Sequence, residues 1–247
     1  MRCGVAGAAL LALATLGAAS LAAQRPVPPP LPAADARWSA RREALVARWL
    51  EPYGITDSAT LRAMRTVPRH EFVPRAQRAR AYDDIPLPIG LEQTISQPYV
   101  VALMTQLVHP RAGMRALEVG TGSGYQAAVL AEAGCRVWTI EIFAALAREA
   151  RARLARLGYG AVAVRHGDGY LGWPEAAPFD AILVTAAADS IPPALLAQLA
   201  PGGRLVMPVG DPSTSQDLML VEKDERGVQR ERRVIPVRFV PLLRGIR

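Results

Sequence analysis

The stretch LEVGTGSGYQAA, residues 117–128, decides the fold. An apolar run ends at Val119, and glycines then stand at positions 120, 122 and 124 before an alanine-rich run begins. Glycines at such a point let the backbone turn sharply and let a ligand approach without meeting a Cβ atom. Because an ordinary tight turn also needs glycine, the meaning of this loop depends on what flanks it.

Strand-like and helix-like segments alternate around the loop. Strands are predicted at 115–120, 136–141, 161–169, 179–187 and 204–210, and helices at 125–134, 143–158 and 194–203. Two further segments, 217–224 and 232–242, are predicted to form a terminal β pair joined across 225–229. Strands separated by helices of this length indicate parallel βαβ units and a doubly wound α/β sheet.

Acidic residues follow two of the predicted strands. Glu141 ends the second strand, where a carboxylate can accept hydrogen bonds from both hydroxyls of a ribose. Asp168, in HGDG, can accept from an adenine amino group, although an Asp between two glycines is also an ordinary turn residue. Together with the glycine loop, these residues favour a site for a nucleoside.

The spacing of the glycines separates two classes of ligand. A dinucleotide fingerprint, G-x-G-x-x-G, requires a third glycine at the position that Tyr125 occupies. The G-x-G-x-G spacing present here is the form found in S-adenosylmethionine-dependent methyltransferases, whose ligand has no pyrophosphate to place on a helix N-terminus. A dehydrogenase is therefore the weakest interpretation.

A second polar segment precedes this domain, in IPLPIGLEQTISQPYVVALM at 85–104. Prolines frame Thr94 and Ser96, directly before an apolar helix predicted at 98–108. No His or Cys lies close by in the sequence to make Ser96 a nucleophile. The segment therefore has a function other than covalent catalysis, or it caps the helix that follows.

Helical patterns also precede this segment, one from Asp35 and one over 59–67. They resemble a lid or wall placed before the main domain. We therefore predict an N-terminal helical segment over 37–110 and a main domain over 111–247.

The N-terminus has a pattern of its own. Arg2 is followed by an uncharged Ala/Leu-rich run to Ala23, so residues 1–23 resemble a secretory signal peptide. The Pro-rich residues 24–36 are predicted to be a semi-rigid linker. This pattern favours export to the periplasm. The alternatives are a cytoplasmic protein whose start codon is placed too far upstream, and a retained anchor, for which so much Ala and Gly is weakly suited.

Charge and cysteine content exclude several classes of protein. The net charge is +7 and Lys223 is the only lysine, but the arginines are scattered rather than interleaved with aromatics as on a nucleic-acid surface. Cys3 and Cys135 provide no disulfide framework. The histidines at 70, 109 and 166 lack metal-ligand spacing, so no metal site is predicted.

Motifs along most of the chain match one known family. They are FVP at 72–74, AYDDIPLPIG at 81–90, QTISQPYVVALMT at 93–105, LEVGTGSGYQAAVLA at 117–131, HGDG at 166–169, APFDAILVTAAA at 177–188, QLAPGGRLVMPVG at 198–210 and VRFVPL at 237–242. From about Trp38 to the C-terminus, the chain closely resembles the protein-L-isoaspartate O-methyltransferases. The TISQP turn is specific to that family, whereas many methyltransferases share the glycine loop.

The resemblance implies both a fold and a reaction. The fold would be a Rossmann-like doubly wound sheet of the S-adenosylmethionine-dependent methyltransferases, with an N-terminal helical extension and a C-terminal β pair. The reaction would pass a methyl group from S-adenosylmethionine to the free α-carboxylate of an L-isoaspartyl residue in a damaged protein or peptide. The ester then cyclises to a succinimide without the enzyme, which starts repair.

The resemblance also implies roles for individual residues. Ser96 would donate a hydrogen bond to the substrate or fix its pose, and Thr94 would assist in the same substrate-binding turn. The residues implied in cofactor binding are Glu118, Gly120, Thr121, Gly122, Ser123, Gly124, Glu141, Asp168 and Gly169. No metal is implied, and we expect a monomer without nucleic-acid or stable membrane partners.

Two other functions remain open. One is a methyltransferase acting on a nucleic acid or a small molecule, although VTAAADSIPPALL at 184–196 has no aromatic after its prolines to bind a flipped base. The other is a protein that binds the cofactor without turnover, because S-adenosylmethionine is made in the cytosol. The intact glycine loop, Glu141 and Ser96 argue against such a decayed function.

One position departs from the family pattern. The family usually has Gly directly before the Gln of QTISQP, and this chain has Glu92. A carboxylate pointing into a carboxylate-binding cleft would repel the substrate. We therefore expect Glu92 to point to solvent and Glu92→Gly to keep or raise activity.

Overall fold

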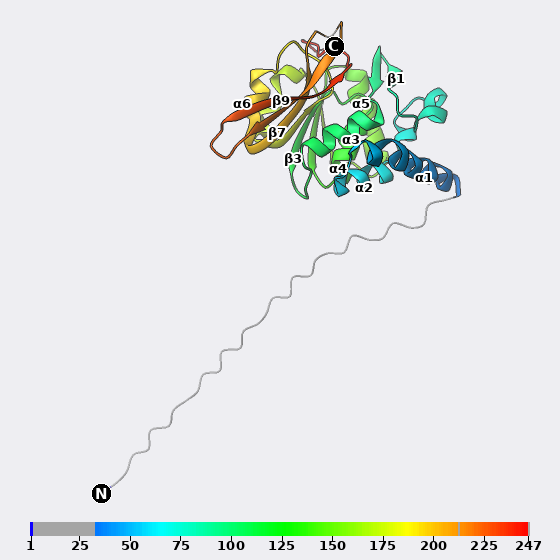
Figure 1. Ribbon diagram of the computed structural model, residues 1–247, viewed down its shortest axis with the longest axis horizontal. Coiled ribbons are helices and arrows are strands. Elements are labelled where there is room, and N and C mark those ends of the chain that lie inside the picture. The colour runs from blue at the N-terminus through cyan, green and yellow to red at the C-terminus, as the bar shows by residue number, and fades with distance from the viewer. Residues whose placement is uncertain (2–32, 212, 247) are drawn as a thin grey trace.

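The computed structural model describes Met1, residues 33–211 and residues 213–246. Its centre is a seven-stranded sheet with the strand order β5-β4-β3-β6-β7-β8-β9 (Figure 1). The strands are β3 (Arg115–Val119), β4 (Arg136–Glu141), β5 (Ala163–His166), β6 (Phe179–Val184), β7 (Leu199–Val209), β8 (Gln216–Lys223) and β9 (Gln229–Val237).

The strand order reverses between β3 and β6. From β3 the chain moves outward through β4 and β5, and it then returns to β6, which pairs with the other side of β3. The strands from β5 to β7 are parallel, whereas β8 is antiparallel to both β7 and β9. This topology confirms the predicted Rossmann-like α/β sheet. Ligands of such sheets bind outside the carboxyl ends of the strands at the reversal.

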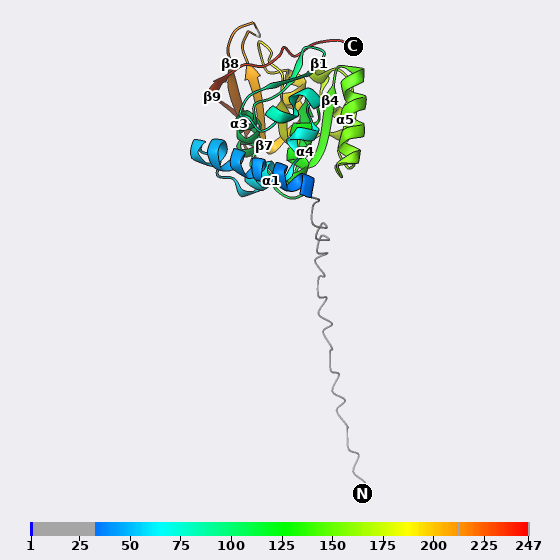
Figure 2. The same ribbon diagram turned by 90° about the vertical axis from the view of Figure 1, so that its right-hand side faces the viewer.

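Alternate side chains of the strands contribute to two apolar layers, one on each face of the sheet. On one face, Ala116 and Leu183 belong to the same cluster as Met104 and Leu130 from helices. On the other face, Leu117 packs with residues of β6, β7 and α6. The helices of the main domain are α4 (Tyr125–Glu132), α5 (Ala144–Arg156), which lies along β4 and β5 (Figure 2), and α6 (Pro193–Gln198).

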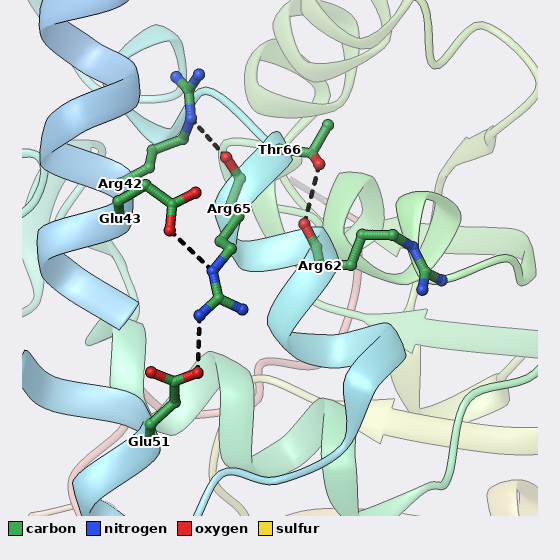
Figure 3. A network of polar contacts seen from close by, with 6 residues as sticks. All are labelled: Arg42, Glu43, Glu51, Arg62, Arg65 and Thr66. Carbon is green, nitrogen blue, oxygen red and sulfur yellow. Dashed lines mark hydrogen bonds and ion pairs between the residues drawn. The ribbon is translucent and has the colours of Figure 1, made fainter. Parts of the chain in front are cut away.

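The N-terminal segment covers the face on which α4 lies. Its helices are α1 (Ala33–Leu45), a π-helical turn (Val46–Leu50), α2 (Ser58–Thr66) and α3 (Pro98–Leu107), with 3₁₀ turns at Glu51–Tyr53, Arg69–Glu71 and Arg75–Arg80. Figure 3 shows how α1 and α2 are joined: Arg42 Nε donates to the Arg65 carbonyl at 2.7 Å, and the Arg65 guanidinium contacts Glu43 and Glu51. These contacts tie α2 to the helix before it.

A two-stranded hairpin in this segment was not predicted from the sequence. β1 (Leu87–Gly90) pairs with β2 (Gln93–Ile95), and the turn between them is Leu91–Glu92. Both turn residues have positive φ, +50° and +57°, as a type I′ hairpin turn requires. Pro88 and Gly90 in β1 conceal the alternating pattern that identifies a hairpin.

Several predicted boundaries were also wrong. β5 covers Ala163–His166 rather than 161–169, and β6 ends at Val184 rather than at 187. The helix predicted at 194–203 ends at Gln198, and β7 begins at Leu199, because residues 200–203 bulge out of the pairing between β6 and β7. The last predicted strand began at 232 and ran to 242, but β9 covers Gln229–Val237, and the chain beyond it leaves the sheet. The leader and most of the predicted linker lie outside the described residues.

Within residues 33–211 and 213–246, we find no helix that combines the length and apolarity needed to span a bilayer.

Replacing Glu92 by glycine should stabilise the hairpin. A residue with a Cβ atom in the left-handed region costs about 1–2 kcal/mol, which glycine avoids. Part of this gain is offset because glycine has more conformational freedom in the unfolded chain. We therefore expect Glu92→Gly to raise the free energy of unfolding by roughly 0.5 kcal/mol, as measured by urea denaturation. A decrease would show that the exposed Glu92 side chain makes a stabilising interaction that outweighs its backbone conformation.

Candidate active site

A first cleft lies at the carboxyl ends of β3, β4 and β6. It sits where the strand order reverses, the position at which open α/β sheets bind ligands. Its walls are the glycine loop, the ends of β4 and β6, the residues around β2, and the chain that follows β9. Segments far apart in the sequence therefore meet at one site.

The loop after β3 can be built only with glycine at position 120. Gly120 has a φ of +99°, which glycine adopts without strain. A Cβ atom there would lie 2.5 Å from Oγ1 of Thr185. The same Thr185 hydroxyl donates to the Gly120 carbonyl at 2.7 Å. This close approach joins the ends of β3 and β6 at the floor of the cleft.

Two buried carboxyl groups line the first cleft. Glu141 accepts from the backbone N–H groups of Gly122 at 2.7 Å and Phe143 at 3.0 Å. Burial raises the pKa of Glu141 despite these hydrogen bonds, which act to lower it. Glu118 accepts from the Thr139 hydroxyl at 2.5 Å through Oε2, while its buried Oε1 has no hydrogen-bond partner among the described residues.

Burial also raises the pKa of Glu118 to about 8, and the nearby charge of Glu141 adds to this effect. Glu118 is fully buried. At neutral pH it therefore holds a proton in the absence of a cationic ligand, whereas such a ligand would favour the ionised form.

A second cleft meets the first at the TISQP turn. It is lined by Pro86, Thr94, Ser96, Gln97, Tyr99, Val100, Thr185, Ser215 and residues 235–240. Thr94, Ser96, Thr185 and Val240 line both clefts. The Ser96 side chain thus lies at the boundary between them.

The Ser96 hydroxyl does not cap α3. The N-cap residue of α3 is Gln97, and no side chain of its own caps the helix. Instead, Asp84 accepts from the Tyr99 backbone N–H at 2.8 Å. Among the described residues, the Ser96 hydroxyl has no hydrogen-bond partner, so it is available to a ligand.

Most of the residues proposed from the sequence lie around the first cleft. The lining includes Thr94, Ser96, Glu118, Gly120, Thr121, Gly122, Ser123, Glu141 and Gly169. Gly124 and Asp168 are not part of it. Gly124 is the N-cap of α4 and faces Leu154 of α5. Asp168 accepts from the backbone N–H groups of Tyr170 at 2.9 Å and Gly245 at 3.1 Å.

Residues 40–246 match the family model described as Protein-L-isoaspartate(D-aspartate) O-methyltransferase (PCMT). The chain belongs to this family. Protein-L-isoaspartate O-methyltransferase 2 of Syntrophobacter fumaroxidans is 57% identical over 218 residues, which cover 87% of this chain and 88% of that protein. The protein-L-isoaspartate O-methyltransferase of Opitutus terrae is 58% identical over 203 residues, covering 82% and 87% of the two chains.

Solved structures give the same assignment. One protein-L-isoaspartate O-methyltransferase superposes with a TM-score of 0.72 at 32% identity, over 81% of this chain and 65% of that chain. A Plasmodium falciparum protein of the same description, solved with S-adenosyl-L-homocysteine, has a TM-score of 0.69 at 26% identity, over 84% and 99% of the two chains. The chain therefore shares the family fold as well as its sequence motifs.

Sequence reasoning missed several residues that line the clefts of this methyltransferase. Val240, Pro241, Leu242 and Leu243 close one side of the first cleft, and the exposed Arg238 lines the second. The signal was present in VRFVPL at 237–242, which we assigned entirely to a strand. Tyr125 was considered only as a bulky replacement for glycine, although it too lines the first cleft.

Apart from the carboxyl groups of Glu118 and Glu141, the two clefts are poor in groups that act as bases at neutral pH. Among the described residues, their linings include no His, Cys or Lys. His109 lies elsewhere, within 3.1 Å of Arg204. In the same part of the chain, we find no group of three or more His, Cys, Asp or Glu side chains suited to hold a metal.

The buried Glu118 should make the unliganded protein less stable as the pH rises. Between pH 4.5 and about 8, folded Glu118 keeps a proton that the unfolded chain has released, so stability decreases through this window. We expect Glu118→Gln to remove much of this decrease, as measured by urea unfolding at about pH 5 and about pH 8. An equal loss of stability in the variant and the parent would assign the effect to other groups.

Proposed function

We propose that this chain transfers a methyl group from S-adenosyl-L-methionine to the free α-carboxylate of L-isoaspartyl residues in damaged proteins and peptides. The close relatives named as protein-L-isoaspartate O-methyltransferases support this acceptor. The related structure that contains S-adenosyl-L-homocysteine supports the co-substrate. The methyl ester formed then cyclises to a succinimide, whose hydrolysis returns part of the chain to a normal aspartyl linkage.

The first cleft fits the charge of the co-substrate. S-adenosylmethionine supplies an electrophilic methyl group on a sulfonium, and it also carries an ammonium group. The buried Oε1 atom of Glu118 lacks a partner and can accept from a cation. Glu141, fixed by two backbone N–H groups, can accept from ribose hydroxyls. Gly120, Thr121, Gly122, Ser123 and Gly169 would form the backbone cradle around this ligand, while Gly124 and Asp168 would support it from behind.

The second cleft fits an acceptor that needs no deprotonation. A peptide α-carboxylate is ionised above about pH 4 and is already a nucleophile at neutral pH. The absence of His, Cys and Lys from the described lining is therefore no obstacle to the reaction. What the protein must do is hold one carboxylate oxygen in line with the methyl group, and such positioning contributes roughly 7–11 kcal/mol to lowering a barrier.

The observation that carries this proposal is the meeting of the two clefts at Ser96. Its hydroxyl can donate to the second oxygen of the acceptor carboxylate, which orients the first oxygen toward the methyl group. Thr94, at the same boundary, would assist in holding the substrate. Arg238 would draw the acidic substrate into the second cleft by its charge.

Several features of the protein belong to the same proposal. We expect it to act as a monomer on polypeptide substrates, without a nucleic-acid or stable membrane partner. We also retain the division into a leader over 1–23, a linker over 24–36, an N-terminal segment over 37–110 and a methyltransferase domain over 111–247. The leader favours a periplasmic location, and the cytosolic supply of S-adenosylmethionine favours the cytoplasm.

The proposal is tested by following base-labile transfer of labelled methyl groups to an isoaspartyl peptide, with the normal aspartyl peptide as the control acceptor. We expect transfer to the isoaspartyl peptide alone. Ser96→Ala should lower kcat roughly 100-fold, the usual cost of removing one donor from a reacting centre, while Ser213→Ala, exposed and outside both clefts, should not. Equal transfer to both peptides, or no transfer to either, would contradict the proposal.

A further inference from the structure

Arg69 is fully buried, and proteins rarely bury an arginine completely. It begins the 3₁₀ turn Arg69–Glu71 and has no solvent-exposed surface. Among the described residues, it forms no ion pair with a carboxylate within 4 Å. An interior cation without a paired anion costs several kcal/mol relative to its hydrated state, so its contacts must provide an advantage that a smaller apolar residue would not.

The guanidinium group binds three backbone carbonyls, two in the turn over residues 81–85 and one at Ser96. Its Nη2 donates to the Ser96 carbonyl at 2.7 Å and to the Ile85 carbonyl at 3.4 Å, and its Nε donates to the Ala81 carbonyl at 2.9 Å. The shortest of these contacts holds the backbone of Ser96 itself. A planar group with donors in a fixed fork can hold three carbonyls in one arrangement, which a lysine ammonium on a flexible stem cannot reproduce.

The same guanidinium also contacts the ring of Tyr125, which lines the first cleft. Its Cζ lies 4.9 Å from the ring centroid of Tyr125, within the range of a cation–π contact. Tyr125 directly follows the glycine loop, lines the first cleft and is fully buried. Phe72 packs edge-on against the same ring, at 5.5 Å between centroids. Arg69 therefore connects the Ser96 turn with the start of α4.

We propose that Arg69 is a positioning residue that fixes the distance between the Ser96 hydroxyl and the glycine loop. This inference rests on the proposed function, because it assigns to that distance the alignment of the acceptor carboxylate with the methyl group. Arg69 touches neither substrate. It acts by holding the Ser96 carbonyl on one side and the Tyr125 ring on the other, so that the two clefts keep one geometry.

This role also explains two features that cofactor and substrate binding do not explain. The third glycine of a dinucleotide fingerprint is replaced by a large aromatic ring, and that ring is the surface on which the guanidinium rests. The Ser96 turn lies outside the seven-stranded sheet, and a buried cation bonded to its backbone supplies a rigid support. Misplacement of a reacting group by about 1 Å can cost roughly 100-fold in rate.

The test compares Arg69→Met and Arg69→Lys with Arg42→Met as a matched control. Arg42 is also buried and also donates to a backbone carbonyl, that of Arg65 at 2.7 Å (Figure 3). It joins α1 to α2 and lines neither cleft. Each variant is measured for kcat, for KM of the isoaspartyl peptide and of S-adenosylmethionine, and for its unfolding temperature without ligands. The full-length chain is used throughout, well below the unfolding temperature of each variant.

We expect Arg69→Met to lower kcat about 100-fold and Arg69→Lys about 10-fold, with little change in KM for S-adenosylmethionine. Arg42→Met should lower the unfolding temperature and leave kcat unchanged. Combining Arg69→Lys with Ser96→Ala should lower kcat no further than Ser96→Ala alone, because both changes remove the same interaction. Hydrogen exchange of the Tyr99 and Val101 amides, which donate to Asp84 and to the Gln97 carbonyl directly after Ser96, should become faster in Arg69→Lys than in Arg42→Met.

Three results would overturn the inference. They are a wild-type kcat in Arg69→Lys, a kcat loss in the double variant equal to the product of the two single losses, and unchanged exchange of the Tyr99 and Val101 amides. If Arg69→Met does not fold, Arg69→Lys and its double variant decide the question. Failure of the wild-type protein to methylate the isoaspartyl peptide would instead contradict the proposed function, so the two failures are distinct.

Discussion

The contact between Gly120 and Thr185 is the constraint on which the rest of the site depends. It brings the end of β3 against the end of β6 at the only place where the strand order reverses among the described strands, and it leaves no space for a side chain at position 120. Because the loop turns there, the Gly122 N–H points back to Glu141 on β4 and fixes its carboxylate. One backbone conformation thereby orients groups from three neighbouring strands around a single cleft.

The chemistry proposed for that cleft explains which groups it contains and which it lacks. An acceptor that is already ionised requires alignment rather than a base, and the described lining offers hydroxyls and backbone groups instead of His, Cys or Lys. The buried ionisable groups have two roles around the clefts. Glu118 and Glu141 suit a cationic co-substrate, and Arg69 holds the backbone of the Ser96 turn. Glu118, Thr121, Ser123, Gln126 and Glu141 are buried polar residues that line the first cleft.

The sequence predicted the parts of the fold in which local pattern and tertiary structure agree. Apolar runs at β3, β4 and β6, and the glycines after β3, indicated both the sheet and the cofactor cleft. The Leu91–Glu92 hairpin was missed because its turn places two non-glycine residues at positive φ. Arg69 was missed because a charged residue is ordinarily exposed, and only the three-dimensional contacts reveal that it lies beneath Ser96. The chain after β9 was assigned to a strand because it is apolar. In the structure, several of these apolar residues line the first cleft instead.

The most direct test of catalysis by positioning without a base is the pH dependence of kcat with both substrates saturating. Saturation keeps Glu118 in its ligand-bound form, and the acceptor carboxylate stays ionised across the range studied. We expect kcat to stay constant between about pH 6 and about pH 9. A kcat that rises or falls with an apparent pKa near 6.5 would reveal a catalytic acid or base, and it would contradict a mechanism in which Ser96 and its supports only align the reacting atoms.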